Sequence, residues 1–140
     1  MYDVIIVGGG PGGLTSGIYA SRANMKTLLI RSAFKPSLIT TTDLIENYPG
    51  FPEGIGGFEL VERFTQQALR FGTEIMDDDL STIAATRVDG HAGWQMSTSS
   101  GEFKTLSVIL STGTEYAHLN VPGEAEFTGR GVSYCATCDG

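Results

Sequence analysis

Two continuous apolar runs, Val-Ile-Ile-Val and Thr-Leu-Leu-Ile, lie within residues 3–7 and 26–30 near the start of the chain. Apolar runs without polar alternation are typical of strands that are buried on both faces of a parallel sheet. Between them, Leu14 and Ile18 lie one helical turn apart among small residues, which predicts a helix over residues 12–23. The pattern therefore predicts a βαβ unit.

The next part of the chain has no period and leads into an amphipathic segment. Residues 31–57 follow neither a helical nor a strand period, which predicts a long ordered loop of a kind that is usually functional. Residues 58–71 predict a helix that covers one face of the sheet. Its apolar face is formed by Val61, Phe64, Ala68 and Phe71.

Strand-like alternation dominates the second half of the chain. A short strand is expected at residues 74–76. Three alternating stretches follow, at residues 80–88, 94–98 and 103–106. The turn dipeptides Asp89-Gly90 and Ser100-Gly101 separate these stretches, which predicts a small antiparallel meander. Residues 108–110 predict a return to a buried strand, so the expected fold class is α/β, a Rossmann-like βαβ unit with a parallel sheet plus the meander.

Composition narrows the classes of partner. The chain has 140 residues with 41% hydrophobic and 18% charged content, which predicts a folded domain. A net charge of -7 without any basic run makes nucleic acid and membrane surfaces poor partners. No signal peptide and no apolar stretch of about 20 residues is found, so we expect a cytoplasmic protein, in which structural disulfides are rare.

The first chemical motif is Gly8-x-Gly10-x-x-Gly13, placed between the first strand and the first helix. In a dinucleotide fingerprint the first glycine permits a tight turn, the second admits a pyrophosphate, and the third permits close helix packing. The pyrophosphate then lies at the helix N-terminus. A glycine-rich structural turn is the alternative, and the motif leaves FAD and NAD(P) both open.

Arg31 stands at the end of the second predicted strand. An acidic side chain at this place would accept hydrogen bonds from a ribose 2′-hydroxyl. An arginine there either favours a 2′-phosphate, and hence NADP, or lies in solvent, and both alternatives stay open.

The second chemical motif is Cys135-Ala136-Thr137-Cys138, followed by Asp139. Two thiols at this spacing can close as a disulfide, and one can become a nucleophilic thiolate near neutral pH. Asp139 can exchange a proton if burial raises its pKa. Half of a zinc site is less favoured, because His91 and His118 do not stand at metal-ligand spacing from the cysteines. Two buried inert cysteines are the third possibility.

Five motifs occur here in the order and spacing of the bacterial-type, low-molecular-weight thioredoxin reductases, and together they span almost the whole chain. They are GGGPGG at 8–13, TTTDLIENYPGFPEG at 40–54, STG at 111–113, VPGE at 121–124 and GRGVSYCATCDG at 129–140. The chain thus resembles this family, and CATCDG is the most specific element. The resemblance implies that the glycine motif holds FAD.

The resemblance also implies roles for single residues. The cofactor-binding positions that it implies are Gly8, Gly10, Pro11, Gly12, Gly13, Arg31, Thr42, Asn47, Thr112 and Gly113. Cys138 resembles the flavin-side thiol, Cys135 its partner, and Asp139 the proton donor. It implies no metal site.

The resemblance implies a homodimeric, flavin-dependent disulfide reductase. In it NADPH reduces FAD, the reduced FAD reduces the Cys135–Cys138 disulfide, and the dithiol reduces thioredoxin. Residues 1–115 would be the N-terminal part of the FAD domain, and residues 116–140 the connection to an NADPH domain. Because the family continues beyond this length, we expect a fragment that is inactive alone.

Two departures from the family pattern leave alternatives open. The family usually has an acidic residue where Arg31 stands, and a Gly-Gly-Gln-type turn where this chain has Lys35-Pro36-Ser37-Leu38. The alternatives are a related flavoprotein with another electron donor, such as ferredoxin, and a degenerate FAD-binding or interaction module without turnover.

Overall fold

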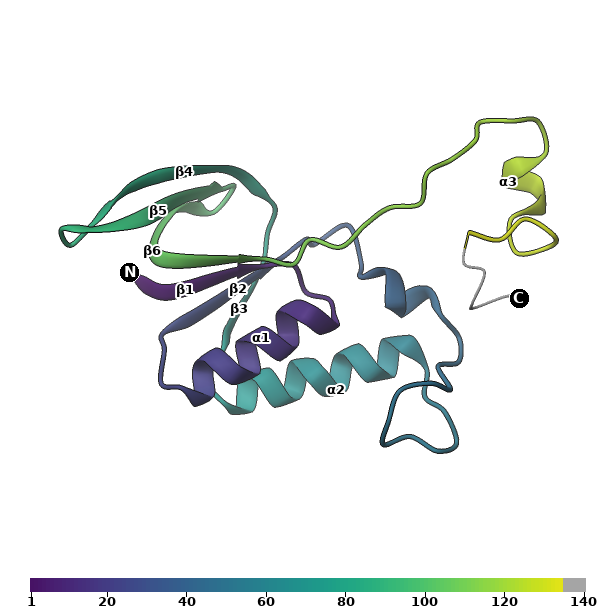
Figure 1. Cartoon of the computed structure of the whole chain (residues 1–140), viewed down its shortest axis with the longest axis horizontal. Helices are drawn as coiled ribbons and strands as arrows, with labels where there is room; N and C mark the ends of the chain where they lie inside the picture. The colour runs from purple at the N-terminus through teal and green to yellow at the C-terminus, as the bar shows by residue number, and fades with distance from the viewer. Residues whose placement is uncertain (135–140) are drawn as a thin grey trace.

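The structure, a computed structural model of the chain, describes residues 1–134. Figure 1 shows a sheet with two long helices on one side and a short helix far from both, at the end of an extended segment. In chain order the elements are β1 (Tyr2–Val7), α1 (Pro11–Arg22), β2 (Thr27–Arg31), the 3₁₀ helix η1 (Leu38–Thr41), α2 (Gly57–Arg70), β3 (Glu74–Asp77), β4 (Leu80–Val88), β5 (His91–Thr98), β6 (Gly101–Leu110) and α3 (Glu124–Phe127).

The strands form one six-stranded sheet in the order β3-β2-β1-β6-β5-β4. β1 lies at its centre and pairs in parallel with both β2 and β6, while β2 pairs in parallel with β3. β5 pairs antiparallel with β4 and β6. The predicted α/β class, with a βαβ unit and an antiparallel meander, is confirmed.

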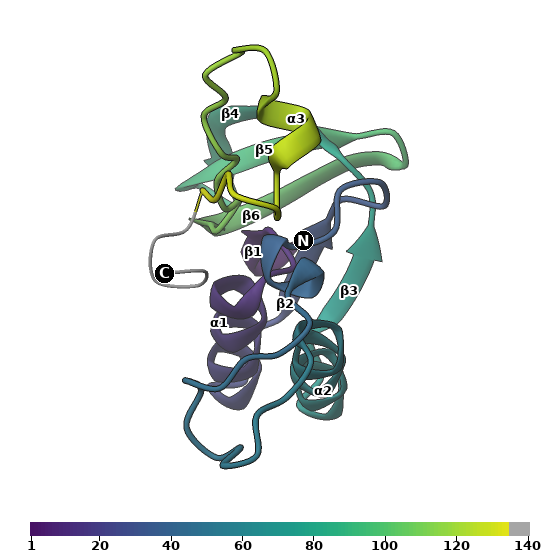
Figure 2. The same ribbon diagram turned by 90° about the vertical axis from the view of Figure 1, so that its right-hand side faces the viewer.

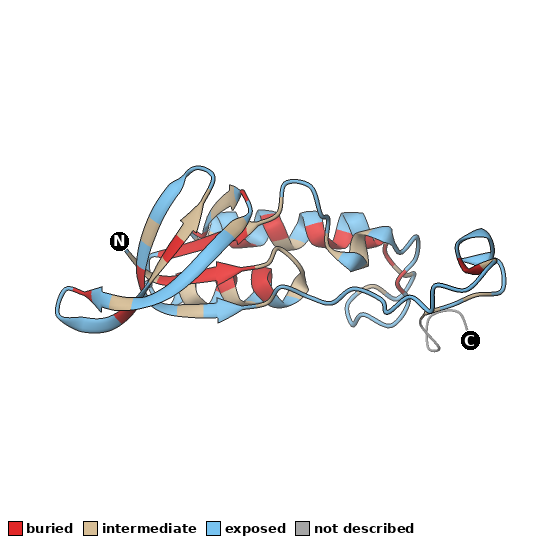
Figure 3. Ribbon diagram, turned by 90° about the horizontal axis from the view of Figure 1, so that it is seen from above, coloured by how far each residue is buried: buried red, intermediate tan, exposed pale blue. Residues whose placement is uncertain are grey.

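Both faces of β1 and β2 are buried, as their continuous apolar runs predict. On one face, α1 and α2 enclose a cluster formed by Val4, Ile6, Leu14, Ile18, Leu29, Val61 and Ala68. On the other face the meander curls over a second cluster formed by Ile5, Val7, Leu28, Ile30 and Met96. Figure 2 shows the resulting layers, with the helices below and the meander above the parallel strands, and Figure 3 shows the buried residues concentrated between them.

The prediction of two separate strands at 103–106 and 108–110 is wrong. Both stretches belong to the single strand β6. Thr105 pairs with Trp94 of β5 on one side and with Tyr2 of β1 on the other. The change in the apolar pattern near residue 107 therefore marks a change of pairing partner and not a break in the strand.

The end of β6 also differs from the buried strand that its apolar sequence predicts. Ile109 is 37% and Leu110 64% exposed. The pairing of β6 with β5 ends at Thr105, so within residues 1–134 this end of β6 pairs with β1 alone. One edge of β6 is therefore left open in the part of the chain that is described.

The loop at 31–57 is ordered, as predicted, and contains η1. Ile45 and Ile55 exchange two backbone hydrogen bonds, with N···O distances of 2.8 and 3.0 Å. Both side chains pack on Leu60 of α2 in a third apolar cluster. Leu60 is fully buried, because the returning loop covers it. It lies one helical turn before Phe64 and so extends the predicted apolar face by one residue.

α2 otherwise follows the prediction closely. Val61 and Ala68 are buried, while Phe64 and Phe71 are partly buried against the same cluster. None of the helices within residues 1–134 has the length and apolar character needed to cross a bilayer.

Leu60 and Leu69 lie on the same helix and provide a matched test of this packing. Leu60 has 0% and Leu69 52% exposure. We expect Leu60→Ala to lower the free energy of unfolding by about 3 kcal/mol, because it leaves a cavity between α2 and the loop. Leu69→Ala should change it by less than about 0.5 kcal/mol. Urea unfolding followed by circular dichroism measures both, and equal losses would contradict the packing described here.

Candidate functional site

The turn that follows β1 is held between its two neighbouring strands. The amide of Gly8 donates to the carbonyl oxygen of Ile30 on β2 at 2.8 Å, and the amide of Ser111 donates to that of Val7 at 2.8 Å. Gly8 has φ +117°, and a Cβ there would overlap the carbonyl oxygen of Ser111. A side chain is therefore excluded by both conformation and space.

The first turn of α1 packs directly on the backbone of this turn. A Cβ at Gly13 would overlap the carbonyl oxygen of Gly8, and one at Gly12 would lie 2.8 Å from the hydroxyl oxygen of Ser111. The absence of side chains at these positions therefore fixes where the helix begins relative to β1 and β6.

The start of α1 presents backbone donors that no side chain caps. Gly10 is the N-cap residue in an extended conformation, with φ −80° and ψ −178°, and makes no side-chain capping bond. Pro11 follows at the first helical position, where its fixed φ suits a helix and its missing N–H costs nothing. The first N–H groups of a helix lack intrahelical acceptors and carry partial positive charge, so this start can bind an anion.

The carboxyl ends of three parallel strands meet around the glycine turn. β6 continues into Thr112 and Gly113, both exposed, and a Cβ at Gly8 would lie 3.2 Å from the amide nitrogen of Thr112. Loop residue Ser37 approaches from another side, its hydroxyl oxygen 3.2 Å from a Cβ built at Gly10. In open α/β sheets this edge is where ligands bind.

Arg31 lies at the same edge but is held by its neighbours. Its Nε donates to the carboxylate of Asp77, which is its partner in the pairing of β2 with β3. Its Cβ and Cδ lie 2.7 and 2.8 Å from a Cβ built at Gly9. The arginine stem therefore borders the glycine turn while its guanidinium is paired.

The remaining predicted positions are placed less tightly. The carbonyl oxygen of Thr42 accepts a bond from the amide of Gly57 at 3.0 Å, and Asn47 is exposed between the two bridging isoleucines. Within residues 1–134 no hydrogen bond joins either side chain to the glycine turn. Cys135, Cys138 and Asp139 lie outside the described residues.

Comparison with known proteins decides the family. Residues 2–140 match the pyridine nucleotide-disulphide oxidoreductase family. The chain belongs to this family.

Relatives within the family carry the resemblance further. The thioredoxin reductase of Treponema pallidum is 46% identical over 139 residues, which are 99% of this chain and 44% of that protein. A crystal structure of thioredoxin reductase from Streptococcus pyogenes has 36% identity and a TM-score of 0.83, and covers 99% of this chain and 44% of that one. The resemblance to thioredoxin reductases is confirmed, although the chain spans less than half of these relatives.

A further structural relative is a thioredoxin reductase named for ferredoxin. A ferredoxin-flavin thioredoxin reductase from Clostridium acetobutylicum has 33% identity and a TM-score of 0.70, and covers 99% of this chain and 46% of that one. This chain therefore shares its fold with a thioredoxin reductase whose name includes ferredoxin.

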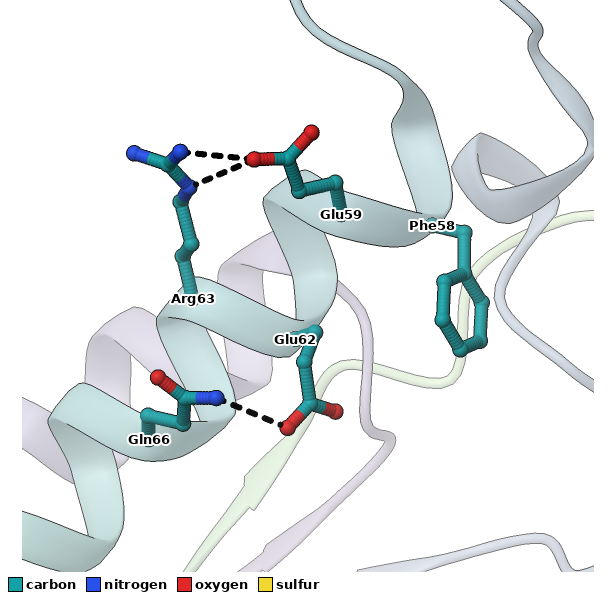
Figure 4. Close-up of a pocket in the computed structure, with 5 residues that line it drawn as sticks. All are labelled: Phe58, Glu59, Glu62, Arg63 and Gln66. Carbon is teal, nitrogen blue, oxygen red and sulfur yellow. Dashed lines mark hydrogen bonds and ion pairs between the residues drawn. The ribbon is translucent and has the colours of Figure 1, made fainter.

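A hollow on the outer face of α2 does not belong to the glycine turn. Figure 4 shows its lining, in which Arg63 bonds twice to Glu59, at 2.6 and 3.0 Å, and Gln66 donates to Glu62 at 3.1 Å. The exposed Phe58 completes it. Pairs four residues apart satisfy one another on a solvated helix face, so the hollow has an ordinary structural explanation.

A buried carboxylate in the segment before the cysteines was missed by the sequence analysis. Glu124 accepts bonds from the amides of Leu119 and Asn120, at 2.9 and 2.6 Å, and from the hydroxyl of Tyr134 at 2.6 Å. The Tyr134 bond, followed by the Leu119 amide, lowers the pKa of Glu124 to about 2. The VPGE motif places an acidic residue directly after Gly123, the N-cap of α3, but it does not show that the carboxylate is buried.

Gly13→Ala tests the crowded contact between α1 and the turn. We expect a loss of about 2 kcal/mol in the free energy of unfolding, because the methyl group would overlap the carbonyl oxygen of Gly8. Gly56→Ala is the control. Gly56 has φ −64°, and a Cβ there would lie 3.5 Å from the carbonyl oxygen of Asp43, an ordinary van der Waals distance. That change should cost less than about 1 kcal/mol. Urea unfolding compares the two, and an equally mild Gly13→Ala would contradict the crowding.

Acid should release the bonds of Glu124. Its folded-state pKa lies below the ordinary value of 4.5, so these bonds contribute fully above that value and are lost as the pH falls toward about 2. The amide NMR signals of Leu119 and Asn120 should therefore shift between these two pH values. In Glu124→Gln that shift should be absent, and a shift that persists in the variant would contradict the assignment.

Proposed function

We propose that this chain is the FAD-binding, amino-terminal part of a flavin-dependent disulfide reductase of the thioredoxin reductase type. The observation that carries the proposal is the glycine turn, which brings an uncapped helix start to the carboxyl ends of β1, β2 and β6. Residues 1–115 would form the flavin-binding part, and residues 116–140 would lead into a pyridine-nucleotide domain of a longer, homodimeric and cytoplasmic enzyme.

The residues at the turn suit a dinucleotide. A pyrophosphate needs backbone donors and room for close approach, and the start of α1 supplies both at Gly10, Gly12 and Gly13. Thr112 and Gly113 border the same edge. Thr42 and Asn47, on the adjacent loop, are proposed to contact the flavin part of the cofactor.

We propose a separate role for each of Cys135, Cys138 and Asp139. A bound FAD, once reduced by the electron donor, would supply the two electrons that break the sulfur–sulfur bond between Cys135 and Cys138. Two protons complete the resulting thiols, and Asp139 is proposed to hold one of them. The thiol of Cys135 then attacks the disulfide of thioredoxin, and closure of the Cys135–Cys138 bond releases reduced thioredoxin.

The electron donor has two candidates. The family description names pyridine nucleotides, which favours NADPH. The relative titled ferredoxin-flavin thioredoxin reductase favours reduced ferredoxin as the second candidate. Arg31 is compatible with either, because its guanidinium already pairs with Asp77.

Anaerobic titration of the full-length protein tests the proposal. We expect a visible flavin spectrum that bleaches on addition of NADPH, or of reduced ferredoxin for the second candidate, followed by reduction of thioredoxin. Cys138→Ser should keep the flavin spectrum and lose thioredoxin reduction by more than about a thousandfold, because the dithiol is broken.

Two results would count against the proposal. A folded, colourless protein that does not take up FAD would indicate a module without turnover. If material with the intact mass of 140 residues reduced thioredoxin with NADPH, the proposal that this chain is part of a longer enzyme would fail.

A further inference from the structure

The side chain of Tyr134, the residue directly before Cys135, is held on several sides. Its ring stacks on that of Tyr116, with centroids 5.0 Å apart and an interplanar angle of 17°. The ring of His118 meets it edge-on at 5.2 Å. Its hydroxyl lies 2.6 Å from Glu124 Oε1 and 2.9 Å from His118 Nδ1. The backbone just before the cysteine motif is therefore anchored through this one side chain.

The Tyr134 hydroxyl is held by Glu124, which also binds two backbone amides. Its Oε1 accepts from Tyr134 and from the amide of Leu119, and its Oε2 accepts from the amide of Asn120. His118 Nδ1 lies 3.4 Å from the same Oε1. The carboxylate is buried, although it belongs to a helix of only four residues. The Glu124 side chain thus joins residues 118–120 to Tyr134, at the end of the described chain.

These contacts lie within residues 116–134 and not between this segment and the sheet. Figure 1 shows α3 at the far end of an extended segment without regular secondary structure, well away from β1 and α1. The ion pair between Lys35 and Glu115 is exposed at both side chains and lies before the segment begins. Tyr134 is therefore positioned by its own segment.

We propose that Glu124 is a positioning residue for the Cys135-x-x-Cys138 pair, and that it acts through the hydroxyl of Tyr134 to fix the chain that enters the motif. The proposal rests on the proposed function, in which the two cysteines cycle between dithiol and disulfide. It adds a role for two residues that the proposed function does not use.

The expected effect follows from chain entropy. Closing the Cys135–Cys138 bond requires the reduced chain to bring two sulfur atoms together, and a chain anchored at one end has fewer conformations to lose. Releasing Tyr134 should therefore make disulfide formation less favourable. Tyr134→Phe removes the hydroxyl and keeps the ring, whereas Glu124→Gln removes the charge and keeps the shape.

The experiment is a redox equilibrium of the full-length protein with glutathione. Two thiols and one oxidised glutathione exchange to give the protein disulfide and two reduced glutathione molecules, and the ratio is read by mass spectrometry after acid quenching. We expect Tyr134→Phe and Glu124→Gln each to lower the equilibrium constant for disulfide formation by about fivefold. The double variant should match the larger single effect, because Tyr134→Phe removes and Glu124→Gln weakens the same hydrogen bond.

Matched controls remove the same groups from neighbouring positions. Tyr116→Phe removes the hydroxyl of the other stacked ring, and Glu126→Gln removes an exposed charge from the same short helix. Neither should change the constant by more than about 1.5-fold. Thermal unfolding of all five variants checks that the sheet domain remains folded.

The outcomes separate this proposal from the proposed function. Equal effects in variants and controls, additive effects in the double variant, or no effect of Tyr134→Phe would each overturn the positioning role. Cysteines that do not equilibrate with glutathione in the unaltered protein would overturn it as well. Flavin content is measured separately in the unaltered protein, so a colourless protein with shifted constants would refute the proposed function and leave the positioning role standing.

Discussion

Backbone contact at the end of β1 constrains the arrangement of the whole parallel half of the fold. Gly8 lies against the carbonyl of Ser111, and Gly13 lies against the carbonyl of Gly8, so three chain segments meet where no Cβ fits. α1 can begin only here, and its start is thereby fixed between β1 and β6. No side chain caps the first N–H groups of α1 at this junction, so they are able to bind an anion.

The two faces of the sheet support this junction in different ways. α1 and α2 pack on one face, and the meander folds over the other, so β1 is enclosed without any polar side chain among its buried residues. β6 connects the two halves because it pairs with β5 at its beginning and with β1 at its end. That double pairing brings Ser111 to Gly8. The meander thus contributes to the site by placing the end of β6.

Local patterns in the sequence predicted the elements well, and long-range contacts account for what they missed. Continuous apolar runs predicted β1 and β2 because both faces of these strands are buried. Residue 107 looked like a strand break because sequence alone does not reveal a change of pairing partner. The burial of Leu60 depends on a loop that returns across α2, and the pairing of Arg31 with Asp77 depends on the register of β2 and β3. Helical spacing places Leu60 on the same face as Phe64, but neither the covering loop nor the strand register can be read from the hydrophobic pattern.

The candidate site was also predicted where its geometry is local and missed where it depends on contacts distant in the sequence. The glycine spacing between a strand and a helix predicted the turn, because its geometry is local. Glu124 and Tyr134 were missed because their bonds depend on how residues 116–134 fold back on themselves. A buried carboxylate that is satisfied by backbone amides is not distinguishable in sequence from a solvated one.

The most direct test of the account is an NMR titration of the isotope-labelled, flavin-free protein with FAD. If the glycine turn holds the pyrophosphate, the amide signals of Gly10, Gly12 and Gly13 will shift first and most, together with those of Thr112 and Gly113. If the largest shifts fall instead on the outer face of α2, around Glu59 and Arg63, or if no amide at the turn responds to saturating FAD, the central claim is wrong.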